Sequence, residues 1–275
     1  MTSRTRVDGV DSERVSALDR GLLYGDGLFE TVLVVRGHAP LWPRHMARLA
    51  EGCARLGLPM PSADALWREV VEVTGGLERA VARISVTRGV GARGYAPPRP
   101  SRSTRIVNGS AAPAVPVDWY ARGIRVRFCE LRLAAQPRLA GLKHLNRLEQ
   151  VLARAEWDDA DVAEGLLLDA DGRVVCATAA NLFVARGGRL ATPALTRCGV
   201  AGVARAEVLA RHADAEVRDI AVEELMQADE IFLTSSVRGI LPVRALPGRE
   251  LAPGGFARGL QRAWRALGLI EAGAA

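Results

Sequence analysis

Lys143 is the residue whose type and surroundings point most directly to chemistry. It lies in LAGLKHLNRLEQVLAR, residues 139–154, next to apolar residues that recur at helical spacing, which are Leu145, Leu148, Val151 and Leu152. That spacing predicts a helix with a buried stripe, and it places Lys143 at the mouth of the helix. A lysine amine that is kept neutral in a cleft can attack a carbonyl carbon. The alternative is a solvated lysine in a first helical turn, since most lysines are exposed.

Three further segments could bind a phosphate. GVAGVARAEVLA (199–210) places glycines directly before a predicted helix, where backbone N–H groups and the helix dipole attract anions. FLTSSV (232–237) has three hydroxyls at a strand end, and Arg48 lies between apolar neighbours on a predicted helix. The plain alternatives are a glycine turn, a polar strand end and a snorkelling arginine. Together with Lys143, the three segments fit a phosphorylated aldehyde held as a Schiff base, which is pyridoxal phosphate chemistry.

The composition narrows the class of protein. With 49% hydrophobic and 25% charged residues, the 275-residue chain is an ordinary globular one with material for a substantial core. No apolar run reaches the roughly 20 residues that cross a bilayer, and the N-terminus has no apolar signal region, so we expect neither membrane insertion nor export. The net charge of +6 is scattered, and residues 99–105 lack interleaved aromatics, so nucleic-acid binding is not expected. Four widely spaced cysteines argue against a metal site or disulfides and favour the cytoplasm.

The elements that must position these residues mix strands and helices without strict alternation. Periodicity predicts strands near 26–37, 79–89, 104–109, 123–131, 215–220 and 230–236, and helices near 43–58, 62–76, 201–213, 221–228 and 255–267. It also predicts a strand-turn-strand with its turn at 169–173 and a hairpin at 181–193. A Pro/Ala-rich stretch without periodicity predicts an N-terminal domain (1–112), a linker (113–120) and a C-terminal domain (121–275) that carries the lysine. Such a pattern is typical of an α+β protein of two domains with a cleft between them.

Five motifs carry a resemblance to a known family. DRGLLYGDGLFET (19–31), HMARL (45–49) and GVAGVAR (199–205) match an N-terminal motif, a His-x-x-Arg-Leu motif and a phosphate loop. GLKHLNRLEQV (141–151) and RGVGARGY (88–95) match a lysine segment and a loop that is characteristic of lyases rather than transaminases. From about residue 18 to about residue 245, the chain resembles the class IV (fold type IV) pyridoxal-phosphate aminotransferase-like family.

The resemblance implies a fold and a set of site residues. The fold would be the two-domain α+β fold type IV, which is similar to D-amino acid aminotransferase and holds its cofactor in the interdomain cleft. Lys143 would form the Schiff base with pyridoxal 5'-phosphate, while Arg48, Ser236 and two backbone N–H groups would hold the phosphate. The two N–H groups are those of Val203 and Ala204. Family members often have Thr where Ala204 stands, and the missing hydroxyl removes a hydrogen bond worth about 1 kcal/mol.

Cys176 is a departure from the family pattern. In RVVCATAANLF (173–183), it stands where the family usually has Glu, five residues before the Asn. That carboxylate keeps the pyridine nitrogen protonated, whereas a neutral thiol is only a weak donor or acceptor. A thiolate could pair with a pyridinium, but a buried cysteine in apolar surroundings tends to stay protonated. The alternative is that Cys176 only packs and another group or water meets the nitrogen.

The lyase motifs imply the reaction that converts 4-amino-4-deoxychorismate, a dianion, to 4-aminobenzoate and pyruvate on the folate route. Arg93 is the candidate for contact with a substrate carboxylate, and an arginine that holds its loop together is the alternative. The resemblance also implies a homodimer, for which the sequence adds only that RGVGARGYAPP has no obvious packing partner.

Two other functions stay open at this stage. The first is an aminotransferase of the same fold that acts on a D-amino acid or a branched-chain amino acid, against which the RGVGARGY loop and Cys176 argue. The second is a catalytically inactive protein that binds pyridoxal phosphate, against which the intact Lys143 argues.

Overall fold

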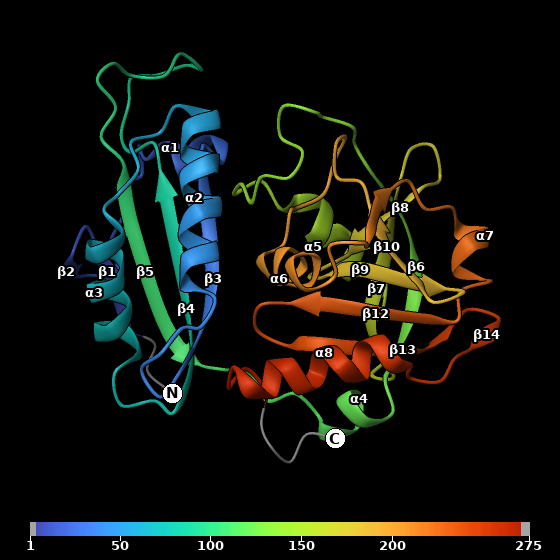
Figure 1. The fold of residues 1–275 in the computed structure, drawn as a ribbon. Coiled ribbons are helices and arrows are strands. Elements are labelled where there is room, and N and C mark those ends of the chain that lie inside the picture. Colours follow the sequence, from blue (N-terminus) through green and yellow to red (C-terminus); the bar gives the residue numbers. More distant parts are fainter. Residues whose placement is uncertain (1–3, 271–275) are drawn as a thin grey trace. The chain divides into compact units, whose positions relative to one another are not determined.

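The computed structural model describes residues 4–270, which form two compact units (Figure 1). Unit 1 contains the chain up to Pro113 together with Leu142–Asn146, and unit 2 contains Ala114–Gly141 and the chain from Arg147 onward. The expected C-terminal domain included Lys143, whereas the contacts group the segment Leu142–Asn146 with the N-terminal part of the chain. Within residues 4–270, every helix is too short or too polar to span a membrane.

Unit 1 is built on a five-stranded antiparallel sheet in the order β2-β1-β5-β4-β3, with β3 at one edge (Figure 1). Strand β3 has nearly every residue buried, because helices cover the sheet and β4 pairs with β3 along its whole length. The strands are β1 (Arg4–Val7), β2 (Val10–Asp11), β3 (Gly27–Val35), β4 (Arg79–Thr87) and β5 (Thr104–Ala111).

The helices in the described part of unit 1 are α1 (Arg20–Tyr24), α2 (Trp42–Leu56) and α3 (Ala63–Thr74). Helix α2 begins with a proline in its first turn and ends at Gly57, whose φ of 62° is the left-handed conformation that glycine adopts at no steric cost. Met46, Leu49 and Cys53 form its buried face, as the helical periodicity predicts. Helix α2 packs on β3, and α3 packs on β5 and β4.

Unit 2 is built on a larger mixed sheet in the order β11-β10-β9-β12-β13-β6-β7-β8, with β14 paired to β13. The pairs β10–β11, β13–β6 and β6–β7 are parallel, and the other pairs are antiparallel. Strands β8 and β9 also contact each other, so the sheet curls. Its strands are β6 (Ile124–Leu133), β7 (Val162–Asp169), β8 (Val174–Ala177), β9 (Asn181–Arg186), β10 (Arg189–Pro193), β11 (Glu216–Arg218), β12 (Glu230–Ser235), β13 (Gly239–Leu246) and β14 (Arg249–Glu250).

The helices of unit 2 pack on separate parts of this sheet. Helix α5 packs on β6 and β7, α6 packs on β12, and α8 packs on β13, where Trp264 and Leu260 are buried. The helices are α4 (Val117–Ala121), α5 (Leu148–Arg154), α6 (Val203–Arg211), α7 (Val222–Leu225) and α8 (Gly255–Ala266). Helix α4 occupies part of the predicted linker.

The main departure from the predicted elements concerns α5. The helix begins at Leu148, five residues after Lys143, so Lys143 is not at its mouth. The predicted buried stripe is also wrong, because Leu148, Val151 and Leu152 are 53–68% exposed. Only Ala153 of this helix is buried in the chain. The periodicity was correct for a helix, but it could not identify which surface the apolar face would meet.

Candidate active site

Lys143 lies in an extended segment that runs along the free edge of β3. The N–H of Phe29 donates to the Lys143 carbonyl over 2.9 Å, and the N–H of Leu145 donates to the Gly27 carbonyl over 3.0 Å. An antiparallel bridge joins His144 to Leu28 between these bonds. The segment therefore extends the sheet of unit 1, which explains why it belongs to that unit although the chain on both sides of it belongs to unit 2.

Glycine at position 25 allows this close approach. Gly25 ends α1 with a φ of 65°, and a Cβ there would overlap the side chain of Asn146. The Asn146 amide donates to the Gly25 carbonyl over 3.2 Å. The GDG of the N-terminal motif thus forms the backbone against which the lysine segment lies.

The Lys143 side chain is half-buried and lies over an aromatic ring of β3. Its Nζ is 4.2 Å from the centroid of the Phe29 ring, and the Arg83 guanidinium carbon is 4.0 Å from the same centroid. Phe29 itself is 6% exposed. Lys143 therefore does not lie in a helical turn, and its amine contacts a buried ring.

Arg48 belongs to a buried polar network centred on Glu30. The Arg48 Nε donates to Glu30 Oε1 over 2.8 Å, its Nη2 donates to Oε2, and His45 Nδ1 lies 2.6 Å from Oε2. Burial alone would raise the pKa of Glu30, but the Arg48 charge and the His45 hydrogen bond lower that pKa to about 2. Burial, helped by the positive charges of Arg48 and Lys143, lowers the pKa of His45. The imidazole is therefore neutral and donates from Nδ1 to an ionised Glu30.

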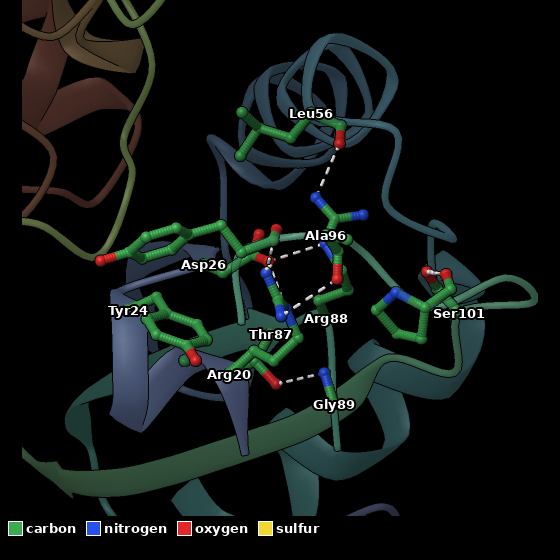
Figure 2. Close-up of polar contacts among 12 residues, drawn as sticks. Arg20, Tyr24, Asp26, Leu56, Thr87, Arg88, Gly89, Ala96 and Ser101 are labelled. Atoms are coloured by element: carbon green, nitrogen blue, oxygen red, sulfur yellow. Dashed lines mark hydrogen bonds and ion pairs between the residues drawn. The ribbon is translucent and has the colours of Figure 1, made fainter. Parts of the chain in front are cut away.

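Arg93 is exposed in the loop that follows β4, and it forms no hydrogen bond or ion pair with any residue between 4 and 270. The loop itself does have partners, because Arg20 and Tyr24 of α1 bind its backbone. Figure 2 shows Arg20, Asp26 and Arg88 beside the loop residues Gly89 and Ala96. The expectation that this loop lacks a packing partner was wrong.

In unit 2, the glycine turn before α6 has backbone donors directed outward from the helix start. The N–H groups of Val203, Ala204 and Arg205 have no acceptor among the residues that the structure describes. Asn181 of β9 binds the preceding turn through its amide, which donates to the Val200 carbonyl over 2.9 Å. At Gly202, the N-cap of α6, a Cβ would lie 2.0 Å from Asn181 Oδ1, so a larger residue would have to displace the Asn181 side chain.

Hydroxyl groups at the end of β12 share this part of unit 2. Thr234 pairs with Asn181 across β12 and β9, so both side chains lie on the same face of the sheet. Thr234 is 2% exposed, and its Oγ1 has no hydrogen-bond partner among residues 4–270. Ser236 is half-buried in the turn after β12. Free N–H groups and an orphaned hydroxyl are the donors that a phosphate accepts from, so this site in unit 2 fits the phosphate of the implied cofactor.

Cys176 lies in β8 within an apolar cluster of unit 2. It is 7% exposed and packs among buried side chains that include Trp157, Leu167 and two other cysteines, Cys129 and Cys198. Burial raises the pKa of the Cys176 thiol to about 12, so the thiol is neutral at physiological pH. Of the two forms considered from the sequence, burial therefore favours the neutral thiol.

The site residues found by sequence reasoning thus separate into two groups. Lys143, Arg48 and Arg93 belong to unit 1, whereas Cys176, Val203, Ala204 and Ser236 belong to unit 2. Sequence reasoning missed Glu30, His45 and Thr234. Glu30 and His45 lie inside quoted motifs, and a charged residue in an otherwise apolar strand was the signal for Glu30.

Comparisons with known proteins show that this chain is similar to aminotransferase class IV proteins. The family model described as "Amino-transferase class IV" matches residues 27–246. The aminodeoxychorismate lyase of Vibrio harveyi is 35% identical over 252 residues, which cover 89% of this chain and 92% of that protein. The D-alanine aminotransferase of Bacillus licheniformis is 27% identical over 269 residues, and the alignment covers 89% of this chain and 88% of that protein. The structure of 4-amino-4-deoxychorismate lyase from Pseudomonas aeruginosa matches with a TM-score of 0.91 and 50% identity, over 95% of this chain and 98% of that one.

Proposed function

Because this chain belongs to the aminotransferase class IV family, we propose that it is a pyridoxal-phosphate-dependent lyase that converts 4-amino-4-deoxychorismate to 4-aminobenzoate and pyruvate in folate biosynthesis. Its α+β architecture of two units is the fold type IV that the sequence predicted. The similarity to two lyases covers most of this chain and most of each of those proteins.

One observation carries the proposal. Lys143 is the only lysine among 37 lysine and arginine residues. Arginine therefore serves every other cationic role in the chain, and arginine stays protonated in proteins, so it cannot act as a nucleophile or a proton acceptor. The single lysine amine of the chain lies over the Phe29 ring, in the extended segment beside β3.

The residues that would hold pyridoxal phosphate are those that the family resemblance implies. Lys143 would bind the aldehyde covalently, and the N–H groups of Val203 and Ala204 would bind the phosphate together with the Ser236 hydroxyl. Arg48 would help to hold the phosphate, in an orientation set by Glu30. When bound, the cofactor supplies an electron sink for the carbon that carries the substrate amine.

Lys143 would then move the protons of the reaction. Its amine takes the proton from the ring carbon that bears the substrate amine, and the electron pair of that C–H bond enters the ring as the C–O bond to the enolpyruvyl group breaks. The ring becomes aromatic, and the ammonium of Lys143 returns the proton to the departing enolpyruvate, which becomes pyruvate. Ionised Glu30 and Arg48 balance each other's charge, and neutral His45 adds none.

Cys176 favours the lyase over an aminotransferase. A neutral thiol is a weak partner for a pyridine nitrogen, so it supports only a weak electron sink. Transamination depends on a strong sink, because the carbanion must persist until it is reprotonated elsewhere. The lyase reaction gains its driving force from aromatisation of the product. A catalytically inactive protein is disfavoured because it has no need for its single lysine.

Other parts of the proposal concern assembly and location. Arg93, exposed and without a partner in residues 4–270, would bind a carboxylate of the dianionic substrate. The exposed apolar side chains of Leu148, Val151 and Leu152 favour a homodimer, since burying them would remove them from water. The four reduced cysteines are consistent with the cytoplasm.

A product assay tests the function. The purified protein, loaded with pyridoxal phosphate, should form 4-aminobenzoate and pyruvate from 4-amino-4-deoxychorismate in equal amounts. A parallel reaction with D-alanine or a branched-chain amino acid and a keto-acid acceptor should be much slower. Transamination without 4-aminobenzoate formation would assign the chain to the aminotransferases, and activity in neither assay would favour the inactive alternative.

A further inference from the structure

We propose that Arg20 is a positioning residue that fixes the exposed tip of the loop 88–101 and thereby holds Arg93 ready for the substrate. The loop follows β4, and Arg20 lies on α1, more than 60 residues earlier in the chain. This inference extends the proposed function, because the consequence for the substrate rests on Arg93 being its partner.

The contacts of Arg20 with the loop tip are made to consecutive backbone carbonyls. Nη1 donates to the Gly94 carbonyl over 2.9 Å and to the Ala96 carbonyl over 3.4 Å, and Nη2 donates to the Tyr95 carbonyl over 2.9 Å. The N–H of Gly94 donates to the Tyr24 hydroxyl over 3.3 Å. The rings of Tyr24 and Tyr95 lie 5.5 Å apart. The peptides directly after Arg93 are thus held on both their N–H and C=O sides.

Asp26 fixes the Arg20 guanidinium in turn. Its Oδ2 accepts from Arg20 Nε over 2.9 Å and from Arg88 Nε over 2.7 Å (Figure 2). Burial alone would raise the pKa of Asp26, but the hydrogen bonds from Arg88 and Arg20 lower that pKa, so the carboxylate stays ionised. Arg88 also donates to the carbonyls of Leu56 and Gly57, over 2.8 and 3.0 Å, at the end of α2.

The energetics of this cluster point to positioning rather than to core formation. Arg20 and Arg88 are 4% and 7% exposed, and removing guanidinium groups from water costs free energy. The loop tip that they hold buries little itself, because Tyr95 is 86% exposed and Arg93 is exposed. The hydrogen bonds of Arg20 and Arg88 fix the loop backbone next to the exposed guanidinium of Arg93. A fixed backbone preorganises that guanidinium for binding a carboxylate.

The same short segment also holds the lysine. Asp26 stands between Gly25 and Gly27, whose carbonyls accept hydrogen bonds from Asn146 and Leu145. The loop that carries Arg93 and the segment that carries Lys143 are therefore both anchored to one stretch of backbone in unit 1. A shift in the strand register at Gly25–Gly27 would therefore displace both Lys143 and Arg93.

Limited proteolysis tests the contact without cofactor or substrate. Trypsin must unfold the loop to cleave after Arg93, because the N–H of that peptide bond belongs to Gly94. Arg20→Met should raise the initial cleavage rate at Arg93 by about tenfold or more, if each lost contact weakens the loop by about 0.5–1.5 kcal/mol. Cleavage after Arg102, between this loop and β5, serves as the internal reference. Tyr24→Phe, which removes only the hydroxyl acceptor, should give a smaller increase and covers the case in which Arg20→Met fails to fold. Equal cleavage at Arg93 in the wild type and both variants would overturn the proposal.

Steady-state kinetics tests the consequence for the substrate. Arg93→Met should raise KM for 4-amino-4-deoxychorismate by roughly 10- to 150-fold, the range of a charge-assisted contact, with kcat much less affected. Arg20→Met should also raise KM, by a smaller factor. The double variant should resemble Arg93→Met alone, because Arg20 acts through Arg93. Effects that multiply, or a fall in kcat at constant KM, would show that Arg20 does not act by positioning Arg93. If the wild type turns over no 4-amino-4-deoxychorismate, the proposed function fails, and the proteolysis still decides whether Arg20 holds the loop.

Discussion

The surroundings of Lys143 in unit 1 and those of Cys176 in unit 2 differ in almost every electrostatic respect. Near Lys143, buried ionised groups are paired through defined hydrogen bonds, and Glu30 is held well below its ordinary pKa by Arg48. The cluster around Cys176 consists of apolar side chains and other thiols, the charges of Glu164 and Arg147 act on it from nearby, and burial is the main reason that the pKa of the thiol is raised.

This contrast indicates where proton chemistry can take place. A group that must exchange a proton during turnover needs neighbours that stabilise both of its charge states, and unit 1 provides charged and hydrogen-bonding groups beside its only lysine. Burial of Cys176 favours the neutral thiol. We therefore expect substitutions near Lys143 to have large effects on activity and a substitution of Cys176 to have a small one.

Lys143→Ala should have the largest effect. Loss of a general base alone typically lowers turnover by about 10²- to 10⁴-fold, and here the covalent attachment of the cofactor is lost as well. Because Lys143 is the only lysine, endoproteinase Lys-C should cut the unmodified chain at one position, and borohydride reduction of the loaded enzyme should abolish that cut. Lys143→Arg, which keeps the positive charge, is the control and should be equally inactive. Undiminished Lys-C cleavage after reduction would contradict the assignment.

Arg48→Ala should destabilise the protein as well as weaken cofactor binding. The substitution leaves the buried Glu30 carboxylate without its charge partner, and breaking a buried pair in this way costs about 3–5 kcal/mol. Chemical denaturation measures the loss in the free energy of unfolding. The matched variant Arg48→Met with Glu30→Gln should recover most of that stability while cofactor affinity stays low. If Arg48→Ala alone is as stable as the wild type, the pair contributes little to folding.

Stability should fall as the pH is lowered, because of the same network. The pKa of His45 is lowered from 6.5 in the folded state, and that of Glu30 is lowered from 4.5 to about 2. The unfolded chain therefore binds more protons, so the free energy of unfolding should decrease from about pH 6.5 downward and more steeply below about 4.5. Urea titrations across this range give the measurement. His45→Gln should flatten the decrease between pH 6.5 and 5, and an unchanged profile would exclude His45 as its source.

Cys176→Ala should have the smallest effect on catalysis. Removing the sulfur leaves a small cavity in an apolar cluster, at a cost of about 1–2 kcal/mol of stability, and no charge changes. Lyase turnover should stay within a few-fold of the wild type, measured beside Cys198→Ala as a control from the same cluster. A loss of turnover specific to Cys176→Ala would mean that the thiol takes part in the reaction.

The sequence alone was sufficient for much of the local structure and for the identity of the main residues. Strand β3, helices α2 and α3, the hairpin β9–β10 and the turn before α6 follow from periodicity, caps and glycines, which act over a few residues. The short elements α1, β1 and β2 and the strand β13 were missed, although several of their contacts are local: β2 pairs with β1 and β13 pairs with β12 across short turns.

Tertiary structure decided which groups meet. The apolar face of α5 looked like a core stripe, yet it is exposed, because periodicity defines a face and not the surface that it contacts. The pairing of the Lys143 segment with β3, of Arg48 with Glu30 and of Arg20 with the loop joins residues 18 to 121 positions apart. Such contacts depend on the register of the sheet and on the shape of the folded chain, neither of which is encoded in the local pattern around any one residue.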